Sequence, residues 1–136
     1  MPTAASAALR AAVHAALTAD PALISALGGQ KIYDEPPREA AFPYVTLGET
    51  RIADFSAGSE PGLEHQLTLH AWSRQGGQRE AHVIAGALLQ ALDDAPLALA
   101  GHQLVNFRFS TADVRREADG RTYHALVRFR AMTEPA

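Results

Sequence analysis

The chain has 136 residues, no cysteine and a formal net charge of −3, with 47% apolar and 20% charged residues. This length and composition are typical of a folded protein with its own core, and we expect one domain over residues 1–136. The absence of cysteine excludes disulfides and thiolate chemistry, and the net negative charge argues against a protein that clamps nucleic-acid phosphates.

The N-terminal segment predicts a helix over residues 3–18, with Thr3 or Ser6 as its N-cap. The segment is rich in alanine, but Arg10 and His14 interrupt it, so we interpret it as a helix rather than a signal peptide. No apolar run in the chain approaches the roughly 18 residues that a membrane span requires.

A second, short helix is predicted from Ala22 to Leu27. Asp20-Pro21 provides an N-cap followed by proline at the first helical position, and Gly28-Gly29 stops the helix. A short extended piece from Lys31 to Tyr33 leads into a proline-rich connection.

The central part predicts two strands and a helix. One strand is expected from Tyr44 to about Phe55, and a second runs from Leu63 to Ser73 with clean alternation of apolar and polar residues. A helix from Gln78 to about Asp93 follows Gly76-Gly77. Its apolar stripe is the clearest in the chain and consists of Ala81, Ile84, Ala85, Leu88 and Leu92.

The C-terminal part predicts two strands around a tight turn. In the first strand, residues 103–110, Val105, Phe107 and Phe109 are expected on one face. Asp119-Gly120 is typical of a two-residue hairpin turn. The last strand places five apolar residues on one face, namely Tyr123, Ala125, Val127, Phe129 and Ala131.

Together these elements predict an α+β fold. We expect an antiparallel sheet of about four to five strands with a long C-terminal hairpin, packed on one face by two to three helices, one of which crosses between the middle strands. The hairpin is long enough to reach past its own core toward a neighbour. The other sheet face is polar but carries Trp72 and several arginines, which favours a subunit interface there.

Catalytic and metal-binding signatures are missing from the sequence. The six histidines include no H-E-x-x-H pattern, and His65 and His70 lie five apart on one strand, so they point to opposite faces. The serines lack a G-x-S-x-G context, and the glycines form no phosphate-binding loop. The acid pairs Asp34-Glu35 and Asp93-Asp94 are interpreted as solvated. We therefore expect no enzyme activity, no cofactor and no metal.

The predicted interface lies on the polar sheet face and in the proline-rich connection. Arginines 108, 128 and 130 are expected to contact neighbouring subunits or partners, with a solvated face or DNA contact as alternatives. Trp72 is either an interface residue or simply half-buried. The connection is either a docking loop or a rigid connector. The full predicted set is His70, Trp72, Arg108, Arg128, Arg130, Pro36, Pro37, Phe42 and Pro43.

Five motifs, in this order, resemble one known family. They are Tyr-Asp-x-x-Pro from residue 33, Phe-Pro-Tyr-Val-Thr-Leu-Gly at 42–48, His-Gln-Leu-Thr-Leu-His-Ala-Trp-Ser at 65–73, a Gly-Gly-to-helix transition, and the arginine-rich strand pair around Asp119-Gly120. Over about residues 5–134 the chain resembles the tail-completion, or tail-terminator, family of long-tailed phages, prophages and gene transfer agents.

The resemblance implies a compact α/β subunit that assembles as a homo-hexameric ring on the head-proximal end of the tail tube. Such a ring ends polymerisation of the tail tube protein and presents a surface to the head–tail connector or stopper, while DNA passes through its centre without specific binding. It implies a place in the neck of a virion or virus-like particle, after synthesis in the bacterial cytoplasm. The alternatives are another neck component, such as a connector or stopper, or a small α+β ligand-binding or enzyme domain.

Overall fold

The computed structural model describes residues 2–136. In this part of the chain it contains three helices and five strands. Their bounds are α1 Pro2–Thr18, α2 Pro21–Leu27, β1 Ile32–Tyr33, β2 Tyr44–Asp54, β3 Leu63–Ser73, α3 Arg79–Leu92, β4 His102–Arg116 and β5 Tyr123–Pro135. None of the described helices is long and apolar enough to cross a membrane.

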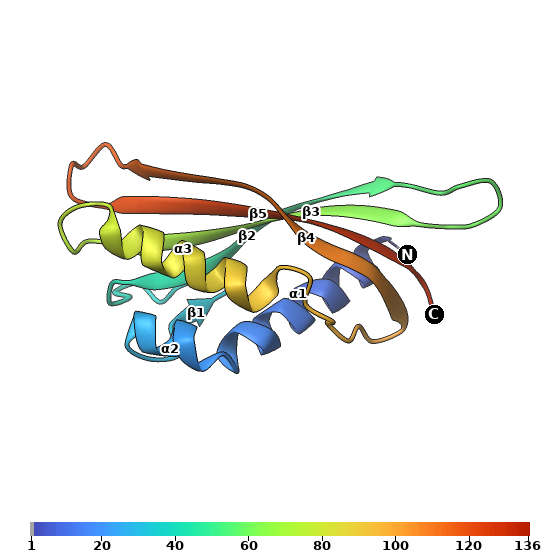
Figure 1. The fold of residues 1–136 in the computed structure, drawn as a ribbon, viewed down its shortest axis with the longest axis horizontal. Coiled ribbons are helices and arrows are strands. Elements are labelled where there is room, and N and C mark those ends of the chain that lie inside the picture. The colour runs from blue at the N-terminus through green and yellow to red at the C-terminus, as the bar shows by residue number, and fades with distance from the viewer. Residues whose placement is uncertain (1) are drawn as a thin grey trace.

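The strands form one sheet in the order β1-β2-β3-β5-β4, and the helices cover only one of its faces (Figure 1). β1 pairs with β2 in parallel, whereas every other pair is antiparallel. The α+β prediction is confirmed, with one short parallel strand added at the edge. α3 joins β3 to the edge strand β4 rather than joining two middle strands, because β5 takes the place between them.

The predicted caps are confirmed for the second helix but wrong for the first. The Asp20 carboxylate accepts a hydrogen bond from the Leu23 N–H at 3.0 Å, and Gly28 closes α2 in the left-handed conformation, φ 76°. α1 already includes Pro2, so Thr3 and Ser6 lie inside it and cap nothing. α1 therefore begins at least one residue earlier than its composition predicts.

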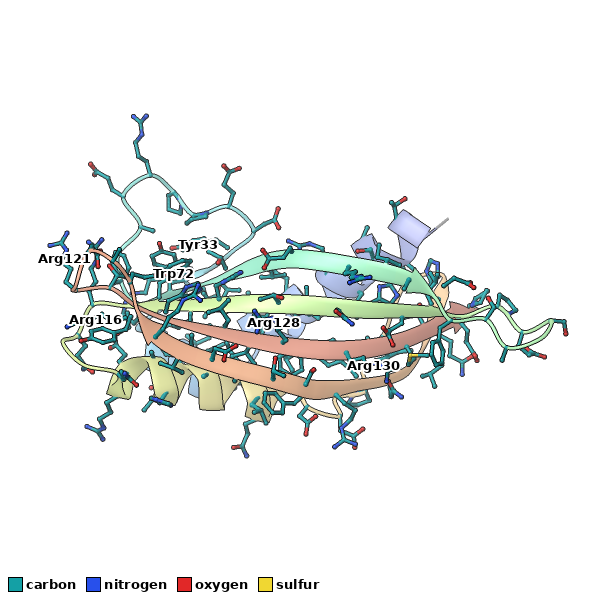
Figure 2. All side chains as sticks on the ribbon, turned by 90° about the horizontal axis from the view of Figure 1, so that it is seen from above. Tyr33, Trp72, Arg116, Arg121, Arg128 and Arg130 are labelled. Carbon is teal, nitrogen blue, oxygen red and sulfur yellow. The ribbon has the colours of Figure 1, made fainter. Side chains whose placement is uncertain are left out.

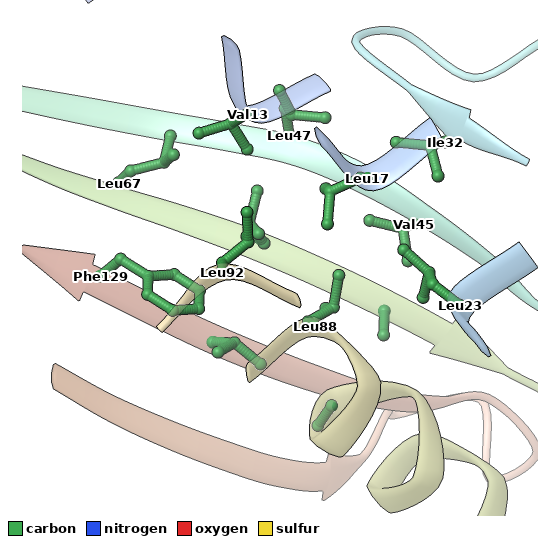
Figure 3. Close-up of a cluster of buried hydrophobic side chains, with 14 of the residues drawn as sticks. Val13, Leu17, Leu23, Ile32, Val45, Leu47, Leu67, Leu88, Leu92 and Phe129 are labelled. Atoms are coloured by element: carbon green, nitrogen blue, oxygen red, sulfur yellow. The ribbon is translucent and has the colours of Figure 1, made fainter. Parts of the chain in front are cut away.

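The core lies between the helix layer and the sheet (Figure 3). Leu17 from α1, Leu23 from α2 and Leu88 from α3 are fully buried against the strands. The rings of Phe107 and Phe129 stack there with centroids 5.0 Å apart. Burial of each large apolar side chain contributes about 1.5–3 kcal/mol, so packing of this layer holds the sheet in place.

β4 departs from the predicted alternation because two register shifts interrupt its pairing with β5. The first shift leaves Val105 without a partner on β5, and its side chain is 55% exposed. Phe107 is buried as predicted, while Phe109, which lies opposite Phe129, stays 37% exposed. The prediction that Val105 shares the core face was therefore wrong, since a bulge reverses side-chain direction in a way that apolar spacing does not reveal.

The β4–β5 turn is longer than the predicted two-residue hairpin. Its closing backbone bond joins the Glu117 N–H to the Thr122 carbonyl oxygen at 2.7 Å. Asp119 organises the turn: its carboxylate accepts hydrogen bonds from the Thr122 hydroxyl at 2.6 Å and from the backbone N–H groups of Thr122 and Arg121. These bonds lower the pKa of Asp119 from 3.8 to about 2, and the bond from the Thr122 side chain has the largest effect.

Replacing Asp119 by alanine is expected to lower the thermal unfolding midpoint at neutral pH, because three donors in the turn lose their acceptor. The folded-state pKa lies below the ordinary value, so the contribution of Asp119 is present above about pH 4 and is lost as the pH falls from 3.8 toward about 2. Thermal unfolding at several pH values tests this. Glu39→Ala, in the exposed connection, is the control, and equal midpoints for the two variants would contradict the role of Asp119.

Both long edges of the sheet are partly covered by polar groups from other segments of the chain. At β4, the Asp93 carboxylate accepts a hydrogen bond from the Phe109 N–H at 2.8 Å, and the Asp94 N–H donates to the Phe107 carbonyl oxygen at 2.8 Å. At β2, the Arg10 guanidinium donates to the Gly48 carbonyl oxygen at 2.7 Å. The interpretation of the two acid pairs as solvated is therefore wrong for Asp93, whose carboxylate is held by Phe109 and Arg108. It holds for Asp34, which pairs with Arg10 but keeps 78% of its side chain exposed.

The part of the chain that extends farthest past the helices is the β2–β3 tip, residues 55–62 (Figure 1). β4 and β5 are long, with 15 and 13 residues, but their turn lies near the start of α3. The prediction that the C-terminal hairpin reaches past its own core was therefore wrong; the projecting tip belongs to the preceding hairpin.

Candidate assembly interface

The sheet face opposite the helices, which we call the polar face, is left uncovered by the described residues (Figures 1 and 2). It carries the side chains of β2–β5 that alternate with the core residues. Strand register places five of the sequence-predicted interface residues on it, namely His70, Trp72, Arg108, Arg128 and Arg130.

An aromatic cluster occupies one end of this face. Trp72 lies directly opposite His124 in the β3–β5 register, and their rings stack with centroids 3.8 Å apart at 12°. Tyr44 stacks on Trp72 at 6.4 Å, and the indole N–H donates to the Thr46 hydroxyl at 3.2 Å. Burial raises the pKa of Tyr44. Trp72 is thus half-buried within its own subunit, with its polar group already bonded.

The proline-rich connection divides into two parts. Phe42 joins the aromatic cluster: its ring lies 5.1 Å from that of Tyr44, and the Arg74 guanidinium lies 4.1 Å above it. Pro43 follows it through a cis peptide bond. Pro36 and Pro37 lie in the loop between Tyr33 and Phe42, which stands away from the sheet (Figure 2).

The three predicted arginines lie together, and each forms an ion pair with an acid of the same chain. Arg108 and Arg130 are opposite each other in the β4–β5 register, where two like charges repel. Three carboxylates offset this repulsion, and the pairs are Arg108–Asp93 at 3.1 Å, Arg128–Asp113 at 2.9 Å and Arg130–Glu64 at 2.6 Å. The hydrogen bond from the Phe109 N–H, followed in importance by that from Arg108, lowers the pKa of Asp93. The arginine side chains remain 40–61% exposed, so solvent screens these pairs and each contributes little to the stability of the fold.

The prediction missed the acidic partners and His124. Residue type alone did not mark them, because each meets its partner only through the register of the strands. The one available signal was alternation: Trp72 and His124 both fall on the polar face of their strands, where they can pair once β3 and β5 are neighbours.

His65 lies on the core side, opposite to His70 as predicted, and it is fully buried. Its Nε2 lies 2.9 Å from the Thr133 hydroxyl, while its Nδ1 has no hydrogen-bond partner. Burial lowers the pKa of His65, so the ring is favoured in its neutral form. Within residues 2–136, no group of three or more His, Asp or Glu side chains is arranged to hold a metal ion.

The described residues define a small α+β protein in which three helices pack on one side of the sheet, while the other side presents aromatic rings and arginines. Residues 11–134 match the family described as "Tail completion protein gp17". The chain belongs to this family of structural phage tail proteins, which confirms the resemblance in the sequence.

Two known proteins are similar to this chain over most of its length. It is 28% identical over 102 residues to the tail completion protein gp17 of Bacillus phage SPP1, a match that covers 74% of each chain. It also superimposes on a chain from a structure described as the virion of a native gene transfer agent particle, with a TM-score of 0.89 and 33% sequence identity. That match covers 96% of this chain and 97% of the other.

Proposed function

We propose that this protein is a tail terminator: a ring of identical subunits, six in number by the family resemblance, that caps the head-proximal end of a tail tube. The ring ends addition of tube protein and joins the tail to the head connector. Family membership over residues 11–134, together with the near-complete superposition on a chain from a gene transfer agent virion, carries this proposal. The place of action is then the neck of a phage or virus-like particle, and the protein acts without catalysis or cofactor.

The polar face is our candidate for contact between subunits. Its aromatic end is stacked within the subunit and is therefore a rigid surface rather than a set of loose side chains. Its arginines are half-exposed and held by single carboxylates, so they can exchange these partners for acids of a neighbour at little cost. The loop with Pro36 and Pro37 stands beside the same end and is a second candidate contact (Figure 2).

The ion pairs of the three arginines are consistent with DNA that passes through the ring without specific binding. An acid beside each guanidinium weakens its attraction for DNA phosphates, and Arg108, Arg128 and Arg130 each have such a partner.

Tail length measured by electron microscopy tests the proposal. Particles made without this protein are expected to carry overlong or unjoined tails, and supplying the chain is expected to restore one uniform length. Tails of normal uniform length that fail to join heads would instead indicate a connector or stopper.

The double variant Arg128→Ala, Arg130→Ala is expected to weaken ring assembly and broaden the tail-length distribution while leaving the subunit folded. The two changes remove half-exposed charges from the polar face but no core side chain. Arg79→Ala, at the exposed start of α3, is the matched control. Native mass spectrometry in the presence of tube ends and electron microscopy provide the readouts. Unchanged rings and tail lengths in the double variant would remove these arginines from the interface.

A further inference from the structure

Four titratable side chains form a continuous hydrogen-bonded chain across the polar face, which we call the relay: Glu49, His70, His124 and Glu117. Glu49 Oε1 lies 3.1 Å from His70 Nε2, His70 Nδ1 lies 2.6 Å from His124 Nε2, and His124 Nδ1 lies 2.8 Å from Glu117 Oε1. Glu49 comes from the bulge in β2 and Glu117 from the first position after β4. The relay therefore crosses the strands on the polar face, from β2 through β3 and β5 to the end of β4.

The two imidazoles are shielded, so water does not readily replace their bonds. The side chains of His124 and His70 are only 5% and 14% exposed. His124 lies against Trp72, and the two imidazole rings stack with centroids 4.8 Å apart. Glycine at position 48 leaves the space for His70, because a Cβ there would lie 2.4 Å from His70 Nε2.

Counting protons fixes the charge state that completes the relay. An ionised carboxylate only accepts hydrogen bonds, so the nitrogen facing each glutamate must carry a proton. The bond between the two rings needs one N–H and one lone pair. Three of the four ring nitrogens are then protonated, whereas two neutral imidazoles hold only two protons.

We propose that the relay is a single-proton latch, in which one excess proton shared by His70 and His124 completes all three hydrogen bonds and ties the β2 bulge to the β4–β5 turn. Burial lowers the pKa of His124, which disfavours a full positive charge on that ring. Hydrogen bonds from its own backbone N–H and from His70 lower the pKa of Glu49, as expected for an ionised end of the relay.

The latch opens in either direction of pH. Loss of the proton leaves two acceptors facing each other at one of the three bonds. A second proton sets two N–H groups against each other across the 2.6 Å gap between the rings. The net charge of the four groups is −1 in the complete state, −2 after loss and 0 after gain, so the charge of the polar face follows the state of the latch.

Neighbouring charges on each adjoining strand act on the same groups. Arg128 on β5 favours ionised Glu49, while Arg115 on β4 lies opposite His124, disfavours its protonation and approaches Glu117 at 4.0 Å. Asp113 on β4 offsets Arg128. The helices lie on the other side of the sheet (Figure 1). The latch is thus a property of the folded subunit, and it stands or fails independently of the proposed ring.

Nitrogen-15 NMR of the imidazoles in the full chain tests the proton count directly. At about pH 6, three of the four nitrogens of His70 and His124 are expected to carry protons, and the single bare nitrogen to be one of the two that face each other between the rings. Two bare nitrogens at that pH would overturn the proposal, as would four protonated ones.

Two isosteric variants give a second, independent test. In Glu49→Gln or Glu117→Gln, the new amide N–H can donate to the adjacent ring nitrogen, so two neutral imidazoles complete the relay and the excess proton is no longer needed. Each variant is therefore expected to lower the pH at which the pair loses its proton by about one unit, a tenfold loss of proton affinity. Glu60→Gln, at the exposed β2–β3 tip, is the control and leaves this midpoint unchanged. Wild-type midpoints in both relay variants would show that no latch exists.

Discussion

Phe129→Ala is expected to lower the free energy of unfolding by about 3–5 kcal/mol, the largest loss from any single substitution considered for this chain. Phe129 lies on β5, the strand flanked by β3 and β4, and it is fully buried. Its ring stacks on Phe107 at 5.0 Å and meets Phe109 edge-on at 6.3 Å. The truncation removes the ring contacts with these two β4 residues and leaves a cavity in the core.

Phe55→Ala is the matched control for this experiment. Phe55 is the same residue type but is 53% exposed near the β2–β3 tip, where the described structure gives it one cation–π contact, with Arg130 at 5.6 Å. Its loss is expected to cost less than about 1 kcal/mol. Urea unfolding of the two variants gives the comparison, and similar losses would contradict the burial of Phe129 in the core.

Gly48→Ala is expected to lower the free energy of unfolding by about 1–3 kcal/mol through overpacking. The added methyl carbon would lie 2.4 Å from His70 Nε2 and 2.8 Å from the Thr68 carbonyl oxygen. His70 can move only by leaving Glu49, and the Thr68 oxygen belongs to the backbone of a central strand. The substitution thus strains the bulge of β2 and breaks one end of the relay.

Gly86→Ala provides a control of opposite sign. Gly86 lies on the exposed side of α3, and no atom lies within 4 Å of an added Cβ. Alanine there is expected to raise the free energy of unfolding by about 0.5–1 kcal/mol, because glycine is the poorer helix former. Chemical unfolding of the pair separates the effect of crowding at position 48 from a general effect of replacing glycine by alanine. Destabilisation of Gly86→Ala would contradict the packing described for α3.

The elements with strong periodicity were predictable from sequence. The buried stripe of α3 and the bounds of β3 match the predictions, because long runs of one period leave little choice of buried face. The bulge at Val105 was not predictable, since an apolar residue in a strand indicates a core position unless the register is known. The length of the β4–β5 turn depended on Asp119 bonds that the Asp-Gly signal does not encode.

The candidate site was predictable only in part. Alternation placed Trp72, Arg128 and Arg130 on the polar face, but the acids that neutralise the arginines come from other elements. The relay joins His70 to His124 across 54 residues of sequence, and it forms only because β5 is inserted between β3 and β4. Long-range strand order, rather than local pattern, therefore decides which polar groups meet.

The polar groups on the sheet edges restrict how copies of this chain can associate. Addition of a foreign strand to β4 would have to displace the Asp93 carboxylate and the Asp94 N–H from Phe109 and Phe107, and addition to β2 would have to displace the Arg10 guanidinium from Gly48. Unprotected edges are templates for uncontrolled strand addition and aggregation. Occupied edges of this kind disfavour sheet extension between copies of the chain, and they leave side-chain contacts as the route by which copies can associate.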